Sequence, residues 1–179
     1  MRAAADASPA SWLLRRDVDW MHLVRLGPPG FAAYVRIALP TDLESDPVRD
    51  ALSVLAGHTT TPDTAYAAVW EGWAGTPPPP GAPRVPVPNR TMLLFTGPVE
   101  VLRDAPALMW EGESAGRMQE PHLVWPEDRA WCLACEVDEE IELSVGCTEQ
   151  AADALGAALP GRVRRVSYGD PGPLYSDEA

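Results

Sequence analysis

Residues 123–138 read LVWPEDRAWCLACEVD, and the rest of the chain is interpreted outward from them. A turn at residues 126–129 leads into a predicted strand at residues 130–138. Side chains alternate between the two faces of a strand, so the large and small residues here fall on opposite sides. One face carries Trp131, Leu133, Cys135 and Val137, and the other carries Ala130, Cys132 and Ala134. Small side chains let a helix approach closely, so the pattern predicts a strand covered on both faces.

The flanking sequence adds strands and helices of ordinary length. Alternation and β-branched content predict strands near residues 31–39, 65–73, 91–95, 123–125, 141–145 and 162–168. The strand at 91–95 is expected to continue at residues 99–102 after a turn. Helices are expected after Ser8-Pro9, after Asp46-Pro47 and after Thr148, where capping residues precede apolar residues at helical spacing. The strand at 141–145 is expected to pair antiparallel with the central one. The fold class predicted is α+β, a mostly antiparallel sheet with two or three packed helices.

The chain of 179 residues is expected to form a single domain over residues 1–179. Residues 1–8 and 170–179 are expected to be loose termini. Residues 74–88 are read as a Pro-rich surface loop, because the run Pro77 to Pro80 favours an extended conformation and prevents regular pairing.

Composition narrows the partners and the compartment. The net charge is −12, and all 14 basic residues are arginines. Nucleic acid is therefore not expected as a partner, because phosphate binding needs clustered cations. No apolar run is long enough for a membrane span, and the first residues lack the apolar core of a signal peptide, so we expect a cytoplasmic protein. No motif predicts a cofactor.

The central turn is one candidate site. Glu127, Asp128 and Arg129 could form a charged site at the entrance of the strand. Asp128 would act there as a base or as an orienting group and Arg129 would clamp an anion, with Trp125 and His122 beside them in a ligand pocket. In the structural alternative, Pro126 takes the second position of a turn, and the charges are solvated or Arg129 stacks on Trp125 or Trp131. Charged turns are common, so the structural alternative is favoured.

Cys132 and Cys135 have the spacing of a redox or zinc motif. Within a strand, however, residues three apart point to opposite faces. A zinc site needs four ligands, and Cys147 and His122 could complete such a set, but the sequence has no second close-spaced pair. We therefore predict buried thiols, with no metal and no disulfide. The sequence contains no nucleophile elbow, P-loop or dinucleotide-binding motif. We therefore assign no catalytic residue and favour a protein without enzymatic activity.

An acidic segment is the other candidate site. Asp138, Glu139, Glu140 and Glu142 are expected on one face, with Glu140 and Glu142 on the outward side of a half-buried strand. Such a face could bind a basic protein partner by electrostatic steering, with Trp110 as an aromatic contact. The alternative is that these acids only keep the protein in solution.

Three motifs resemble a family of uncharacterised actinobacterial proteins. They are residues 69–73 (VWEGW), 93–98 (LLFTGP) and 125–132 (WPEDRAWC), the last being the most specific. The resemblance covers roughly residues 20–160 and implies a shared fold and an actinobacterial source, with no activity. The function expected is that of a non-enzymatic accessory protein, such as an immunity protein, that binds a basic partner. The alternative is a small-ligand-binding or enzymatic domain with a Trp/Arg-lined pocket near the central turn.

Overall fold

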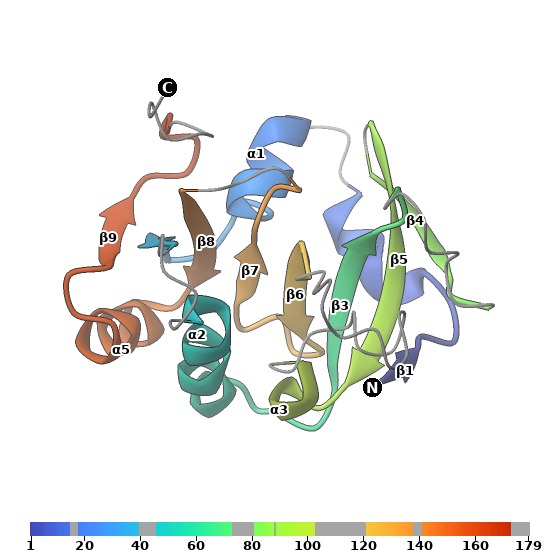
Figure 1. Cartoon of the computed structure of the whole chain (residues 1–179), viewed down its shortest axis with the longest axis horizontal. Helices are drawn as coiled ribbons and strands as arrows, with labels where there is room; N and C mark the ends of the chain where they lie inside the picture. Colours follow the sequence, from blue (N-terminus) through green and yellow to red (C-terminus); the bar gives the residue numbers. More distant parts are fainter. Residues whose placement is uncertain are drawn as a thin grey trace.

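A single sheet of nine strands runs through the computed structural model, counted over the residues that the structure describes: 1–14, 18–39, 46–72, 81–87, 89–102, 121–137 and 141–172 (Figure 1). Its order is β1-β5-β3-β6-β7-β8-β2-β9, with β4 also beside β5, and the described pairs are all antiparallel. The prediction of a mostly antiparallel sheet is confirmed. The strands are β1 (Arg2–Ala3), β2 (Ala33–Ala38), β3 (Ala65–Trp70), β4 (Arg84–Val87), β5 (Arg90–Gly97), β6 (Leu123–Pro126), β7 (Cys132–Ala134), β8 (Glu142–Cys147) and β9 (Val163–Val166).

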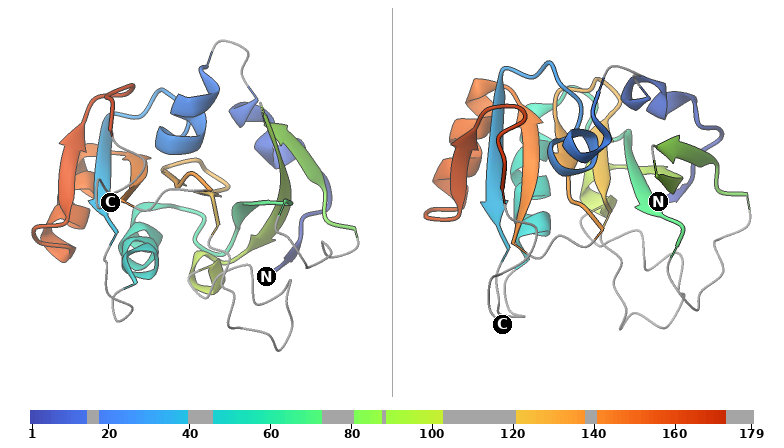
Figure 2. Two further views of the ribbon diagram at one scale, coloured as in Figure 1. Left: turned by 45° about the horizontal axis from the view of Figure 1, so that its top comes forward. Right: turned by 90° about the horizontal axis from the view of Figure 1, so that it is seen from above.

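Helices lie on both faces of this sheet (Figure 2). Residues of α2 (Pro47–Leu55), α3 (Val99–Leu102) and α5 (Glu149–Ala158) share one apolar core with the strands. The 3-10 helix η1 (Ser8–Leu13) and α1 (Trp20–Leu26) contribute to a second core on the other face. A short 3-10 turn, η2 (Ala56–His58), follows α2. The sheet is therefore buried on both sides over most of its width.

The central strand has the two-faced character that the sequence predicts, although β7 is shorter than residues 130–138. Leu133 belongs to the core under α2 and α5, whereas Cys132 and Ala134 belong to the opposite core. The small residues permit a close approach of α1, because a Cβ built on Gly27 would lie only 3.3 Å from the Cys132 sulfur. Trp131 is fully buried and donates its indole N–H to the carbonyl of Leu55 at 2.9 Å.

Two of the predicted helix starts are correct. Asp46 accepts the N–H of Arg49 at the start of α2, and Thr148 accepts the N–H of Ala151 at the start of α5. These side chains satisfy amide groups that a helix start leaves without an intrahelical partner. The first helical region differs from the prediction, since its described residues, 8–14 and 18–26, hold two elements, η1 and α1, instead of one helix.

Several segments depart from the predictions. Residues 99–102 form α3 and not a strand, because the carbonyl of Pro98 accepts the N–H groups of Val101 and Leu102 and starts a helical turn. Within the terminus predicted as loose, Arg2 and Ala3 pair with β5 as β1. Residues 84–87, predicted as part of a loop, form β4 beside β5, whereas residues 74–80 and 88 of the same predicted loop lie outside the described residues.

The other predicted loose end begins with an anchored segment. The guanidinium group of Arg36 donates to the carbonyls of Asp170 and Pro171, and Arg25 donates to that of Gly172 at 2.8 Å. Residues 170–172 are thus held against β2 and α1, while residues 173–179 lie outside the described part. Within the described ranges, no helix combines the length and apolar character needed to cross a membrane.

Candidate functional site

The turn between β6 and β7 has an unusual residue in its last position. The N–H of Arg129 donates to the carbonyl of Pro126 at 2.9 Å, so Pro126 is the first residue of the turn and not the second. Arg129 has a φ of +56°, a left-handed conformation in which glycine is usual after a turn of this kind. The N–H of Glu127 donates a hydrogen bond to the carbonyl of Thr64, the residue before β3, and this bond fixes the turn to the start of that strand.

Asp128 holds this turn in place. Its carboxylate accepts the hydroxyl of Thr59 at 2.8 Å and both the N–H and the hydroxyl of Thr60 at 2.7 Å each. It also accepts the N–H of Ala130 within the turn. Burial acts to raise the pKa of Asp128, but the hydrogen bonds from Thr60, Thr59 and Ala130 outweigh it and lower the pKa. Asp128 therefore stays ionised, with its oxygens engaged by the protein, and the role of a base predicted for it is not supported.

A pocket of about 290 Å³ opens beside the turn, on the face of the sheet that η1 covers. Three parts of the chain meet there: the start of η1, the strands β3 and β6, and the turn. The lining residues are Ser8, Pro9, Tyr66, Trp125, Glu127 and Arg129. Trp125 and Arg129 were predicted to line such a pocket, and the structure brings them together.

Aromatic rings form one wall of the pocket and continue beneath it. Tyr66 stacks on Trp125 with 5.8 Å between ring centroids and 28° between planes. Trp12 of η1 meets Trp125 edge-on at 6.1 Å, and Phe31 packs edge-on against Trp12 at 6.4 Å. Packing of this kind limits the rotamers of each ring, so the pocket wall is rigid before any ligand arrives.

Arg129 is held by the same aromatic group. The carbon at the centre of its guanidinium lies 5.3 Å from the centroid of the Trp12 ring, which is a cation–π distance. The ring is that of Trp12 and not, as predicted, that of Trp125 or Trp131, because η1 packs over this part of the sheet. In the described part of the chain, no carboxylate lies within ion-pair distance of this guanidinium. The cation is therefore positioned on the rim of the pocket while its N–H groups keep their capacity to donate.

Buried donors without acceptors lie in this wall. Trp125 has no solvent exposure, and its indole N–H has no hydrogen-bond partner in the structure. The indole N–H of Trp12 is likewise buried and without a partner. Leaving a buried donor unsatisfied costs about 1–3 kcal/mol, so these two indoles reduce the stability of the wall.

The electrostatic balance of the pocket shows in Tyr66. Burial raises the pKa of its phenol, and the negative charges of Glu127 and Asp6 raise it further. Asp6 is fixed close by, since its carboxylate accepts the N–H of Ser8 at 2.8 Å. Tyr66 therefore keeps its proton at neutral pH and presents a hydroxyl donor to the pocket.

His122, the fourth residue predicted for this pocket, lies elsewhere. It precedes β6, at the opposite end from Trp125, and its Nδ1 accepts the N–H of Trp70. The ring is 7% exposed and does not line the pocket. Burial, with a smaller effect of the Arg90 charge, lowers the pKa of His122 to about 4. His122 is thus a neutral core residue at neutral pH.

The predicted acidic face has a different character at Glu142, the one member that the structure describes. β8 is buried on both faces, and Glu142 is 8% exposed and not on an outward side. Its carboxylate pairs with Arg36 at 2.8 Å and with Arg164 at 2.8 Å. Its charge is thus compensated internally. Asp138, Glu139, Glu140 and Trp110 lie outside the described residues.

The cysteines are free thiols in the core. Burial raises the pKa of the Cys132 thiol strongly and that of Cys147 to about 11. Both groups are therefore protonated at neutral pH, which makes them poor nucleophiles and poor metal ligands. Over the described ranges, no group of three or more His, Cys, Asp or Glu side chains is arranged to hold a metal ion.

Three lining residues were missed from the sequence: Ser8, Pro9 and Tyr66. Tyr66 and the start of η1 reach the turn only through the pairing of β3 with β6 and the packing of η1 over that pair. No local pattern carries that information. Comparisons with protein-family models, with curated proteins and with solved structures found no match for this chain.

Proposed function

We propose that this protein binds a small polar ligand in the pocket beside the β6–β7 turn. The observation that carries the proposal is the Arg129 guanidinium, which lines the pocket beside the stacked rings of Tyr66 and Trp125 and has no ion-pair partner among the described residues. A few convergent polar groups in a preformed concave site are what small-ligand recognition requires.

The strained conformation of Arg129 supports the same proposal. A non-glycine residue with positive φ costs about 1 kcal/mol or more, and such strain tends to persist where a side chain is needed for function. Here the turn points an arginine at the pocket in a position where glycine would be easier. Asp128 and its threonine partners hold that turn fixed.

The pocket is preferred to the acidic face as the functional site. Glu142 already has two arginine partners, so its charge offers little attraction to a basic protein. The pocket, in contrast, holds two charged side chains, Glu127 and Arg129, that have no ion-pair partner among the described residues. No group in it is arranged as a nucleophile with an activating base, so the proposal is binding without catalysis.

A thermal-shift screen tests this function. The panel would contain amino acids, hydroxy acids, sugar phosphates and nucleosides, each at millimolar concentration. A ligand at about 100 times its Kd stabilises the native state by about 2.7 kcal/mol. We expect the hit to lose its shift in Arg129→Gln and in Trp125→Phe.

Arg49→Gln is the matched control, because it removes the same charge from α2 on the opposite face of the sheet. Its ligand-induced shift should equal that of the wild type. A panel without hits, or a hit that binds all three variants equally, would contradict the proposal.

A further inference from the structure

We propose that the occupant of the pocket is a zwitterion, a small molecule that carries both a carboxylate and an ammonium group, as a free amino acid does. The inference rests on the proposed function and specifies its ligand. It is drawn from the charges, the donors and the size of the pocket.

The pocket presents one fixed charge of each sign. Arg129 and Glu127 both line it and are separated by one residue in the same turn. No ion pair joins these two side chains, and within the described part of the chain neither has another ion-pair partner. The arrangement therefore offers separate positions for an anionic and a cationic group.

Ligands with a single charge fit this arrangement less well. A simple anion attracted by Arg129 would also meet the field of Glu127 and of Asp6, the two carboxylates that act on Tyr66. A simple cation attracted by Glu127 would meet Arg129. A zwitterion satisfies both groups at once, and charge-assisted hydrogen bonds are about twice as strong as neutral ones.

A neutral donor fits the carboxylate end. The phenol of Tyr66 lines the pocket and keeps its proton, so it is able to donate to a carboxylate that Arg129 holds. The stacked rings of Tyr66 and Trp125 give an apolar surface for the rest of the ligand. A volume of about 290 Å³ lies at the lower limit of small-molecule pockets, which suits a molecule the size of an amino acid.

Isothermal titration calorimetry tests the inference with the standard L-amino acids as probes. For each amino acid that binds, the N-acetyl derivative removes the ammonium group and the carboxamide removes the carboxylate. We expect each blocked form to bind at least about tenfold more weakly, the loss of one charge-assisted contact. Equal binding of either blocked form would overturn the inference.

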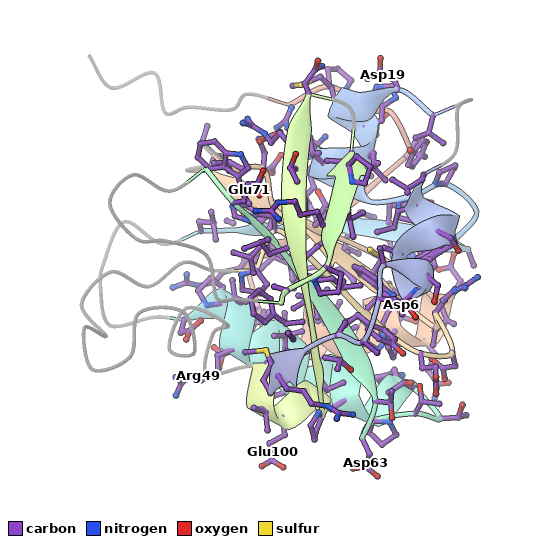
Figure 3. All side chains as sticks on the ribbon, turned by 90° about the vertical axis from the view of Figure 1, so that its right-hand side faces the viewer. Asp6, Asp19, Arg49, Asp63, Glu71 and Glu100 are labelled. Carbon is purple, nitrogen blue, oxygen red and sulfur yellow. The ribbon has the colours of Figure 1, made fainter. Side chains whose placement is uncertain are left out.

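Two variants assign the two ends of the ligand. Glu127→Gln should remove the preference for the free amine over its N-acetyl form and leave the preference for the carboxylate. Arg129→Gln should do the reverse. The controls are Glu100→Gln and Arg49→Gln, whose side chains lie away from Asp6 and the start of η1 (Figure 3). Both preferences should persist in the controls, and their loss there would overturn the assignment.

The outcomes separate this inference from the function on which it rests. If the screen finds a binder that depends on Arg129 and Trp125 but carries only one charge or none, the pocket is a ligand site and the zwitterion inference is wrong. If no compound binds at the pocket, both fail. Binding of an amino acid that is unaffected by Glu127→Gln and Arg129→Gln would place the ligand elsewhere and would overturn both.

Discussion

The main-chain N–H of Trp70 donates a 3.1 Å hydrogen bond to Nδ1 of His122. This bond requires an acceptor, so the neutral ring carries its proton on Nε2. Burial and the nearby Arg90 charge lower the pKa of His122 to about 4, and the imidazole stays neutral in the folded protein far below the pH at which a free histidine becomes charged.

Acidification should therefore destabilise the fold through His122. Between pH 6.5 and pH 4 the unfolded chain binds a proton at this residue and the folded chain does not, so stability falls as the pH falls through that window. The neutral His122 contributes about 3 kcal/mol to the free energy of unfolding, and this contribution is present above pH 6.5 and lost by pH 4. Urea unfolding of the wild type and of His122→Asn at several pH values measures it.

In that comparison the asparagine side chain replaces the acceptor but does not titrate. The stability difference between the two proteins should shrink as the pH falls, while the effects of carboxylates that titrate in both proteins cancel. Parallel curves for the two proteins across this range would contradict the assigned pKa.

Substitutions at Arg129 should separate stability from binding. Both Arg129→Gly and Arg129→Ala lose the cation–π contact with Trp12, but only glycine adopts the φ of +56° without strain. We expect the glycine variant to be more stable than the alanine variant by about 1 kcal/mol in chemical denaturation. Both should lose the ligand of the pocket. An alanine variant as stable as the glycine variant would show that the turn relaxes when Arg129 is replaced.

The ion pair at Glu142 should be important for folding. Glu142→Gln removes the carboxylate that pairs with Arg36, whose side chain is 2% exposed, and leaves a buried guanidinium without its counter-charge. Loss of one partner of a buried pair costs about 3–5 kcal/mol. Here the cost should lie near the lower value, because the carbonyls of Asp170 and Pro171 still accept from Arg36.

Glu149→Gln is the control for that measurement. Glu149 pairs with Arg165 on the surface, where solvent screens the interaction, so the unfolding midpoint should barely change. If the two variants lose equal stability, the buried pair has no special role.

Truncation of Trp131 should be among the most damaging core changes. Trp131→Ala removes a fully buried ring and the hydrogen bond to Leu55, and is expected to cost about 3–5 kcal/mol. Trp131→Phe keeps most of the packing but leaves the Leu55 carbonyl without this donor. The loss should lower the free energy of unfolding by about 1–3 kcal/mol. Val101→Ala, on the exposed side of α3, serves as the control for a surface site. Equal midpoints for Trp131→Ala and Val101→Ala would contradict the interior position of Trp131.

The sequence alone predicted those structural features that depend on residues close together in the chain. The alternation around Leu133 predicted a strand covered on both faces, and the caps at Asp46 and Thr148 predicted the starts of two helices. Each depends on residues a few positions apart. Arg129 and Trp125 were predicted to share a pocket because the turn itself places them near each other.

Sequence reasoning failed where the determinant is long-range. Glu142 follows a pattern typical of a half-buried strand, but the opposite face of β8 is closed by Arg36 and Arg164, which come from β2 and β9. A glutamate and two distant arginines give no signal in a single sequence that they will meet. His122 was misplaced for a related reason, since residues at the two ends of one strand reach different surroundings. Tyr66 enters the pocket only through strand pairing.

The position of β2 has a consequence for synthesis on the ribosome. This strand, complete by residue 38, lies between β8 and β9, which begin at residues 142 and 163. At elongation rates of about 5–20 residues per second, roughly 5 to 20 s pass before the first strand that pairs with the backbone of β2 is synthesised. During that interval the nascent chain holds an aggregation-prone strand without a partner, and chaperone occupancy of residues 33–38 would be greatest then. The pairing of β2 with β8 and β9 can be completed only once the last quarter of the chain has left the ribosome.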